Sequence, residues 1–324
     1  MTVYILLFLL GLACLIKGGD WFVDGASGIA KRFKISEILI GATVVSIGTT
    51  LPEVMVSATG AFEGHGDIAY GNALGSIICN TALISAITMA IRPSAVDKKS
   101  FSVAAAFFFA AAAIYTVFAV TIKDFPRYFG IIMLVIFAIY MTVLIIQAKR
   151  NPAPEPIAPQ EEKPEKPRKL WLEILLLVIG AALIAVGAKL LVDNGTELAR
   201  IIGVSEAVIA LTFVALGTSL PELVTAISAL AKGHSALSIG NIIGANLFNI
   251  VLVMGVAVTV SPFTLPASKT LFGINSSLLV DIPVMIAVML IMTLPPLIHG
   301  KLKRWQGITL LAIYAAFIAF QFAF

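Results

Sequence analysis

Ten long apolar segments constrain what this chain can fold into. A membrane-spanning helix needs about 20 mostly apolar residues, and each of these segments reaches that length. The chain has 324 residues, of which 59% are apolar and 12% charged, whereas soluble globular proteins carry about 25% charged residues. An ordinary soluble enzyme, a disordered protein and a nucleic-acid-binding protein are therefore excluded, and an all-α integral membrane protein with ten transmembrane helices is predicted. The segments are Val3–Ala30, Ile35–Phe62, Ile68–Ile91, Phe101–Ile122, Tyr128–Gln147, Leu170–Leu198, Val204–Ala231, Ala236–Ser261, Leu271–Ile298 and Trp305–Phe324.

The basic residues predict how the segments are oriented. Of 22 lysines and arginines, 16 lie in the loops after the odd-numbered segments and 4 in the loops after the even-numbered ones. Because cytoplasmic loops carry the excess of basic residues, the first set is expected to be cytoplasmic and both termini non-cytoplasmic. The stretch Lys149–Lys169 holds six of the 15 prolines and is too polar to bury a core. We expect a cytoplasmic linker at 149–169 between two halves, 1–148 and 170–324.

The two halves repeat one another at an offset of 169 residues. Ten of 18 positions are identical between Ser36–Glu53 and Ser205–Glu222, which end in G-T-T-L-P-E and G-T-S-L-P-E. A second match, G-N-x-x-G, begins at Gly71 and Gly240. Each half has five segments, an odd number, so the second half is expected to enter the membrane from the opposite side. Such inverted repeats are typical of secondary transporters, whose ion site lies near the membrane midplane.

Each copy of the repeated motif places a glutamate deep in a predicted spanning helix. A carboxylate at that depth is costly unless it is neutralised or paired, and no basic residue lies near Glu53 or Glu222 in the sequence. Two such groups facing one cavity need protons or a cation between them. Ligands that are all oxygen suit Ca²⁺ or Na⁺, and the absence of a nearby histidine or cysteine disfavours zinc and copper.

The prolines before the two glutamates predict backbone ligands. Pro52 has no N–H, so it leaves the Gly48 carbonyl without its helical partner, and Pro221 does the same for Gly217. Carbonyl groups freed in a broken helix are available to bind ions where they line a cavity.

Small and polar residues are expected on the same helix faces as the two glutamates. Thr49 and Thr50 lie four and three residues before Glu53, on its helix face. Thr218 and Ser219 lie at the same distances before Glu222. Ser76 and Asn80 are four residues apart, and so are their equivalents Ala245 and Asn249. The glycine pairs, which are expected to let helices approach closely, are Gly71 with Gly75 and Gly240 with Gly244.

Other polar residues have simpler interpretations. Lys189 and Asp193 have the i, i+4 spacing of a salt bridge at the membrane interface. His65 and His234 are equivalent in the repeat, and each is expected in a short turn.

The paired motifs resemble the alpha repeats of the sodium/calcium exchanger branch of the calcium/cation antiporter superfamily. The resemblance covers nearly the whole chain, and the short linker is similar to that of the compact prokaryotic members. It implies a cation antiporter of the cell membrane that exchanges Ca²⁺ for Na⁺, with no catalytic residues, no cofactor and no nucleic-acid partner, for which a monomer is sufficient.

The resemblance also implies a role for individual residues. Glu53 and Glu222 would coordinate Ca²⁺ at the centre, and Asn80 and Asn249 would orient water or ligands there. The first and sixth segments would slide across the rest to alternate access. The further ligands implied for Ca²⁺ and for flanking Na⁺ sites are the carbonyl groups of Thr49, Thr218, Ser46 and Ala215 and the hydroxyl groups of Thr50, Ser219 and Ser76.

Three positions depart from the family pattern. Ala245 replaces a serine that supplies a Na⁺ ligand, Asn249 stands where many relatives have aspartate, and Thr50 replaces serine. These changes bear on the coupling ion more than on the Ca²⁺ site.

The sequence leaves one alternative function open and disfavours two others. The same fold coupled to H⁺ or K⁺ is the first, because protons can neutralise the same glutamates. A cation channel is less favoured, since carboxylate rings usually need several subunits around one axis. An intramembrane enzyme is disfavoured because Ser219 has no activating His or Lys on a shared face.

Overall fold

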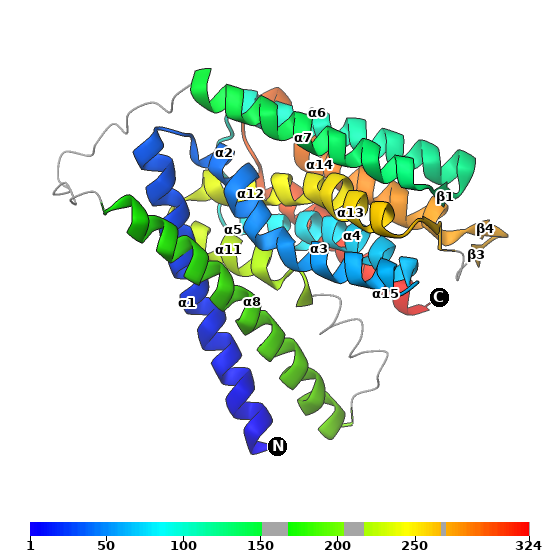
Figure 1. Cartoon of the computed structure of the whole chain (residues 1–324), viewed down its shortest axis with the longest axis horizontal. Helices are drawn as coiled ribbons and strands as arrows, with labels where there is room; N and C mark the ends of the chain where they lie inside the picture. Colours follow the sequence, from blue (N-terminus) through cyan, green and yellow to red (C-terminus); the bar gives the residue numbers. More distant parts are fainter. Residues whose placement is uncertain (151–167, 204–216, 267–269, 324) are drawn as a thin grey trace.

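The computed structural model describes residues 1–150, 168–203, 217–266 and 270–323. Within these ranges it is an almost entirely helical bundle (Figure 1). Eight of the described helices are long and apolar enough to cross a membrane. The seventh predicted segment is represented by a shorter apolar helix, Leu220–Ala231, and the tenth by Arg304–Ala323, which begins with polar residues. Residues 151–167 of the predicted linker 149–169 and residues 204–216 lie outside the described ranges, and Lys149 and Arg150 belong to the helix Arg127–Arg150.

The first half contains five of the eight candidate spans. Three of them combine α-helix with a π-helical turn, labelled η. In chain order the elements are α1 (Thr2–Phe33), α2 (Glu37–Ile40), η1 (Gly41–Val45), α3 (Ser46–Phe62), α4 (Gly66–Cys79), η2 (Asn80–Ser85), α5 (Ala86–Ile91), α6 (Lys98–Val117), η3 (Phe118–Ile122), β1 (Asp124–Phe125) and α7 (Arg127–Arg150).

The second half has the same kinds of element. Its elements are α8 (Leu170–Ile201), α11 (Leu220–Ala231), α12 (Ser235–Phe248), η5 (Asn249–Val253), α13 (Met254–Val260), β2 (Phe263–Thr264), β3 (Thr270–Leu271), β4 (Ile274–Asn275), η6 (Ser277–Asp281), α14 (Ile282–His299) and α15 (Arg304–Ala323). The short strands form two antiparallel pairs, β1 with β2 and β3 with β4, at one end of the bundle. The pair β1–β2 joins the two halves.

Burial separates a central helix from peripheral ones. The continuous helix α12–η5–α13 is buried over most of its length, whereas α1, α7 and α8 expose most of their apolar residues. A large apolar core, rich in aromatic side chains such as Phe108, Tyr115 and Phe248, packs around α12. A smaller cluster around Phe22 and Ile184 joins α1 and α8 to this bundle. Exposed apolar side chains on the peripheral helices suit contact with lipid.

Helices α1 and α8 form an antiparallel pair that lies across the bundle and extends beyond it (Figure 1). A Cβ at Gly11 would lie 2.9 Å from the Gly187 carbonyl oxygen, and one at Gly18 would lie 2.9 Å from the Gly180 carbonyl oxygen. The backbones therefore touch where the sequence has glycine. The seven-residue spacing of these glycines keeps them on one face of each helix.

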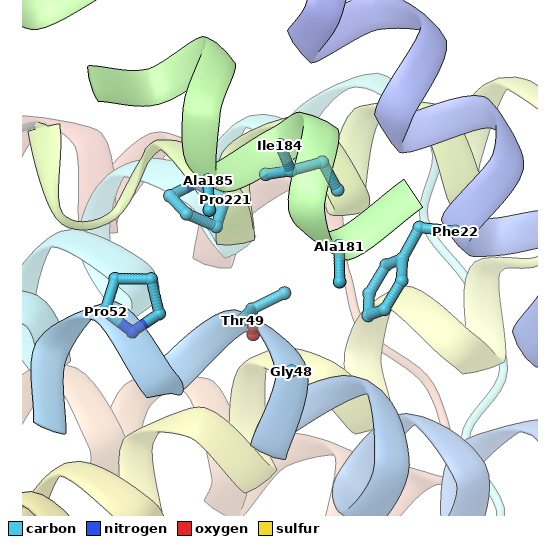
Figure 2. Close-up of a pocket in the computed structure, with 8 residues that line it drawn as sticks. All are labelled: Phe22, Gly48, Thr49, Pro52, Ala181, Ile184, Ala185 and Pro221. Atoms are coloured by element: carbon cyan, nitrogen blue, oxygen red, sulfur yellow. The ribbon is translucent and has the colours of Figure 1, made fainter. Parts of the chain in front are cut away.

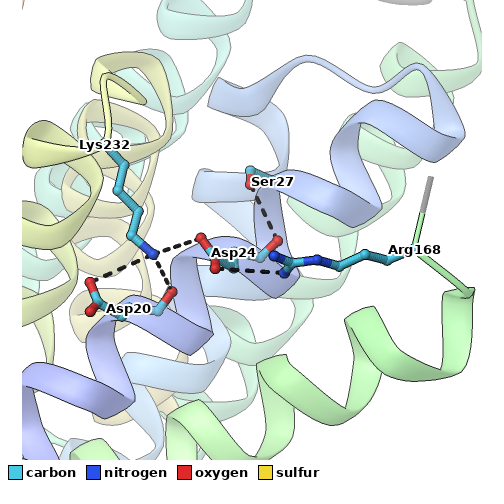
Figure 3. Close-up of polar contacts among 5 residues, drawn as sticks. All are labelled: Asp20, Asp24, Ser27, Arg168 and Lys232. Carbon is cyan, nitrogen blue, oxygen red and sulfur yellow. Dashed lines mark hydrogen bonds and ion pairs between the residues drawn. The ribbon is translucent and has the colours of Figure 1, made fainter. Parts of the chain in front are cut away.

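Ion pairs fix this helix pair at one end (Figure 3). Lys232, in the turn after α11, places its Nζ 2.6 Å from an Asp24 carboxylate oxygen and 2.7 Å from the Asp20 carbonyl oxygen. Within the pair, Arg32 on α1 contacts Glu173 on α8 at 3.0 Å. The predicted Lys189–Asp193 pair is confirmed at 2.9 Å.

The two histidines expected in turns occupy equivalent places. His65 precedes α4 and His234 precedes α12, as expected. His234 in addition contacts Glu37 at 2.7 Å, a contact between the halves that the sequence did not indicate.

Replacing Gly18 by valine is expected to lower the free energy of unfolding by about 2 kcal/mol or more. The added side chain would collide with the α8 backbone, which cannot move without separating the two helices. Ala13→Val is the matched control, because Ala13 lies on the exposed face of the same helix. Thermal unfolding in detergent measures both, and equal melting temperatures for the two variants would contradict the tight α1–α8 contact.

Candidate functional site

The two glutamates of the repeated motif are completely buried. Glu53 lies in the middle of α3, and Glu222 lies in the first turn of α11. Both side chains are 0% exposed. The two carboxyl groups are close enough to interact with one another, so the structure brings together residues that are 169 positions apart in the sequence.

Neither glutamate is neutralised by a described basic residue. Both Glu53 carboxylate oxygens and Glu222 Oε2 lack a hydrogen-bond donor in the described part of the chain. Glu222 Oε1 accepts from the Thr50 hydroxyl at 3.4 Å, and its place in the first turn of α11 sets it at the positive end of a helix dipole. A pair of buried carboxylates with so few donors needs a cation or protons to become stable.

Buried hydroxyl groups come from both halves. Ser76 on α4 and Ser219, at the N-cap position of α11, have hydroxyl oxygens 3.4 Å apart. Thr49 donates to the side-chain oxygen of Asn241 at 3.2 Å. Thr49, Thr50, Ser76 and Ser219 are all at most 3% exposed.

The two predicted asparagines start π-helical turns. Asn80 begins η2 and Asn249 begins η5, and both side chains are 0% exposed. Both polar atoms of the Asn80 amide and Oδ1 of Asn249 lack a described partner, whereas Asn249 Nδ2 donates to the Ala245 carbonyl at 3.1 Å. A π-helical turn leaves irregular backbone bonding and is frequent at functional sites.

The remaining predicted ligands are Thr218, Ala215 and Ser46. Thr218 lies in a partly exposed turn before α11, and Ala215 is outside the described residues. Ser46 begins α3 and is 0% exposed. Its hydroxyl contacts the carbonyl oxygens of Gly41 and Asn241.

The two prolines act differently in the two halves. Helix α3 continues through Pro52, while α11 begins at Leu220, next to Pro221. The expected break is therefore present beside Pro221 and absent at Pro52. The difference is physical: proline fits the first turn of a helix without loss, whereas inside α3 it removes one hydrogen bond that the flanking turns tolerate.

A cavity of about 10 Å³ separates these prolines from the α1–α8 pair (Figure 2). At that volume it holds about one water molecule. The α1–α8 pair thus lies directly over the backbone of the repeated motif. The lining residues are Phe22, Gly48, Thr49, Pro52, Ala181, Ile184, Ala185 and Pro221.

The second glycine pair lets helices approach, as expected. A Cβ at Gly240 or Gly244 would collide with the backbone of the α2–η1 segment. For Gly71 and Gly75, no described residue lies within 4 Å of such a Cβ, so the close approach expected there stays a prediction.

Sequence reasoning missed the two asparagines of the G-N-x-x-G motif. Asn72 donates to the Glu53 carbonyl at 3.2 Å and to the Ser57 hydroxyl at 2.8 Å, and Asn241 accepts from Thr49. The signal for them in the sequence is the repetition of this motif at the 169-residue offset, although its glycines alone predict only helix packing.

The donor set suits a hard cation. In the described part of the chain no group of three or more His, Cys, Asp or Glu residues is arranged to hold a metal ion. The site instead offers two carboxylates together with neutral hydroxyl, amide and carbonyl oxygens. This is the ligand chemistry of Ca²⁺ and Na⁺ rather than of zinc.

Comparison with known proteins gives the family. The family described as sodium/calcium exchanger protein matches residues 3–146 and 172–323. The chain belongs to the sodium/calcium exchanger family. The resemblance drawn from the repeated motif is thereby confirmed, and the family and fold are those of membrane antiporters.

Individual relatives are similar over most or nearly all of the chain. Sodium/calcium exchanger MaX1 of Methanosarcina acetivorans is 30% identical over 99% of this chain and 99% of its own length. Inner membrane protein YrbG of Escherichia coli is 36% identical over 79% of each. The solved structure of the sodium-calcium exchanger NCX_Mj, soaked with Na⁺ and Sr²⁺, matches with a TM-score of 0.81 and 33% identity over 98% of both chains.

Replacing Glu53 by glutamine is expected to raise the free energy of unfolding in ion-free buffer by about 1–3 kcal/mol. The amide removes one of two like charges and can donate to Glu222. Thermal unfolding in detergent without added Ca²⁺ or Na⁺ measures this change in stability.

The matched control is Glu173→Gln, another buried glutamate. Glu173 is paired with Arg32, so its replacement is expected to lower stability, by at most about 1 kcal/mol because the pair is partly exposed. A loss of stability in both variants would show that Glu53 is not an unpaired buried charge.

Proposed function

We propose that this chain exchanges Ca²⁺ for Na⁺ across the cell membrane by alternating access around Glu53 and Glu222. The observation that carries the proposal is the pair of buried carboxylates, one from each half, with three of their four oxygens lacking a described donor. The family membership and the similarity to NCX_Mj support it.

Competition for one charged site makes the process an exchange. One Ca²⁺ balances the two carboxylate charges, and so do several Na⁺ ions that share the surrounding oxygens. An empty pair is a buried, uncompensated charge, which opposes closure of the site. The protein therefore returns across the membrane only when loaded, and net movement of Ca²⁺ requires counter-movement of another cation.

The ligand assignments follow the family resemblance, and the buried carboxylate pair supports them. Ca²⁺ lies between Glu53 and Glu222 with the carbonyl groups of Thr49 and Thr218. Na⁺ uses the flanking hydroxyl and carbonyl groups, and Asn80 and Asn249 orient water or ligands. The ligands proposed for Na⁺ are those of Ca²⁺ together with Thr50, Ser219, Ser76, Ser46 and Ala215.

An inverted repeat of ten spans is part of the proposal. Contacts in the α1–α8 pair exchange under the repeat offset: Gly11 meets Gly187, and their equivalents Gly180 and Gly18 meet each other. That is the pattern of a two-fold axis in the membrane plane. Both termini are then non-cytoplasmic, 149–169 is a cytoplasmic linker between the halves 1–148 and 170–324, and α1 and α8 slide over the rest.

Coupling to H⁺ or K⁺ is the second candidate. Ala245 is fully buried and supplies no side-chain oxygen where the family pattern has serine, and Asn249 adds no charge. With fewer Na⁺ ligands, protons or K⁺ on the same glutamates become competitive. A channel or an enzyme has no comparable support, because the acidic pair belongs to one chain and no activated nucleophile lies beside it among the described residues.

Purified protein in liposomes tests the exchange. Ca²⁺ uptake is expected when an outward Na⁺ gradient is imposed and to be lost in Glu53→Ala and Glu222→Ala, because each variant removes half of the site's charge. Glu63→Ala, at an exposed glutamate just beyond α3, is the control and is expected to transport normally. Uptake that ignores every imposed Na⁺, K⁺ or H⁺ gradient would exclude antiport.

Restoring serine at position 245 is expected to lower the Na⁺ concentration needed for half-maximal exchange by about fivefold, since one added oxygen ligand contributes about 1 kcal/mol. Ala257→Ser, at another fully buried alanine in a separate apolar cluster, is the control for adding a buried hydroxyl. An unchanged Na⁺ requirement in Ala245→Ser would refute a weakened Na⁺ site at this position.

A further inference from the structure

Asn241 connects the central helix to the backbone of the repeated motif. Its side chain is 0% exposed, and its Oδ1 accepts from the Thr49 hydroxyl at 3.2 Å. Its carbonyl oxygen lies 2.9 Å from the Ser46 hydroxyl, which also lies 2.7 Å from the Gly41 carbonyl. One residue of the second half thus contacts two residues at the start of α3.

The surrounding backbone holds Asn241 in place. A Cβ at Gly41 would lie 2.8 Å from the Asn241 backbone nitrogen, and one at Gly244 would lie 2.7 Å from the Ala42 Cα. Helix α12 and the η1–α3 segment therefore touch along their backbones. At such contacts side chains have little freedom, so the hydrogen bonds of Asn241 transmit its position to Ser46 and Thr49.

The equivalent asparagine of the first half contacts the same helix elsewhere. Asn72 donates to the Glu53 carbonyl and the Ser57 hydroxyl. In the second half, Ala226 stands where the repeat offset places the counterpart of Ser57. The two asparagines therefore do not perform symmetric roles; one contacts α3 at its start and the other at the glutamate.

The Asn241 amide is only half satisfied. Its Nδ2 is buried and has no acceptor among the described residues, and a buried unpaired donor costs about 1–3 kcal/mol. A carboxamide placed only for stability would be replaceable by an apolar side chain of similar shape. Its presence at this cost points to the bond that it does make, to Thr49.

We propose that Asn241 is a positioning residue that fixes Ser46 and Thr49 and thereby sets the affinity for the coupling ion. This inference rests on the proposed function, in which the carboxylates dominate the binding of Ca²⁺, whereas Na⁺ depends more on neutral oxygens such as the carbonyl groups of Ser46 and Thr49. Loss of Asn241 should therefore weaken Na⁺ more than Ca²⁺. A residue that only packs would weaken both ions equally or neither.

The test is Asn241→Ala in the full chain, reconstituted in liposomes. The Na⁺ concentration for half-maximal Ca²⁺ exchange is expected to rise about fivefold, and the KM for Ca²⁺ about twofold or less, because the variant loses one hydrogen bond of about 1 kcal/mol, to Thr49, and keeps the backbone carbonyl that contacts Ser46. Equal changes for both ions, or no change for either, would overturn the proposal.

The matched control is Asn246→Ala, at a second buried asparagine on α12. Asn246 donates to the Thr81 hydroxyl at 2.7 Å and to the Met289 sulfur at 3.2 Å, and neither partner is a proposed ligand. It is expected to lower the melting temperature without separating the Na⁺ and Ca²⁺ responses. The same separation in Asn246→Ala would also overturn the proposal.

Thr49→Val tests the route through the hydroxyl. If Asn241 acts through Thr49, the double variant should be no worse for Na⁺ than Asn241→Ala alone; additive losses would contradict that route. Should Asn241→Ala fail to assemble, Thr49→Val removes the same bond and should show the same separation of the two ions.

Measurements on the wild-type protein distinguish a failure of the proposed Na⁺ coupling from a failure of the positioning role of Asn241. If it takes up Ca²⁺ without response to Na⁺, the proposed Na⁺ coupling fails, and the variants are then compared with the ion that does drive uptake. If wild type responds to Na⁺ but Asn241→Ala behaves like Asn246→Ala, only the positioning role fails. Na⁺-dependent shifts of the melting temperature in detergent give a second readout without transport.

Discussion

Two like charges buried side by side are the constraint on which this structure depends. Glu53 and Glu222 come from different halves, and no described basic residue neutralises either one. Such a pair is unfavourable in a membrane interior unless cations or protons occupy it. The surrounding oxygens, from Thr50, Ser76 and Ser219, are neutral and leave the charge to be balanced by whatever ion enters.

The rest of the bundle provides a rigid frame around that unfavourable pair. Helix α12 is buried along most of its length and is in backbone contact with α2 and η1. Helices α1 and α8 form a tightly packed pair that the Lys232 ion pair joins to the turn after α11, and the small cavity beside Thr49 lies between this pair and the motif.

Much of the fold and part of the site followed from the sequence. Apolar length located the helices, and the 169-residue repeat singled out both glutamates. Other features did not follow. The π-helical turns at Asn80 and Asn249 depend on packing, since neither residue type requires such a turn. Helix α3 runs through Pro52 whereas α11 starts beside Pro221, although the two motifs are nearly identical, because flanking contacts decide whether a helix tolerates proline.

The sequence by itself determined the membrane class, the repeat and the identity of the buried acids, because these depend on composition and on spacing along the chain. Only the tertiary structure decided which residues of one half contact those of the other. Thr50 meets Glu222, Ser76 meets Ser219 and Thr49 meets Asn241. These partners lie more than 140 positions apart, and no local pattern specifies contacts that form only when two separately folded segments pack together.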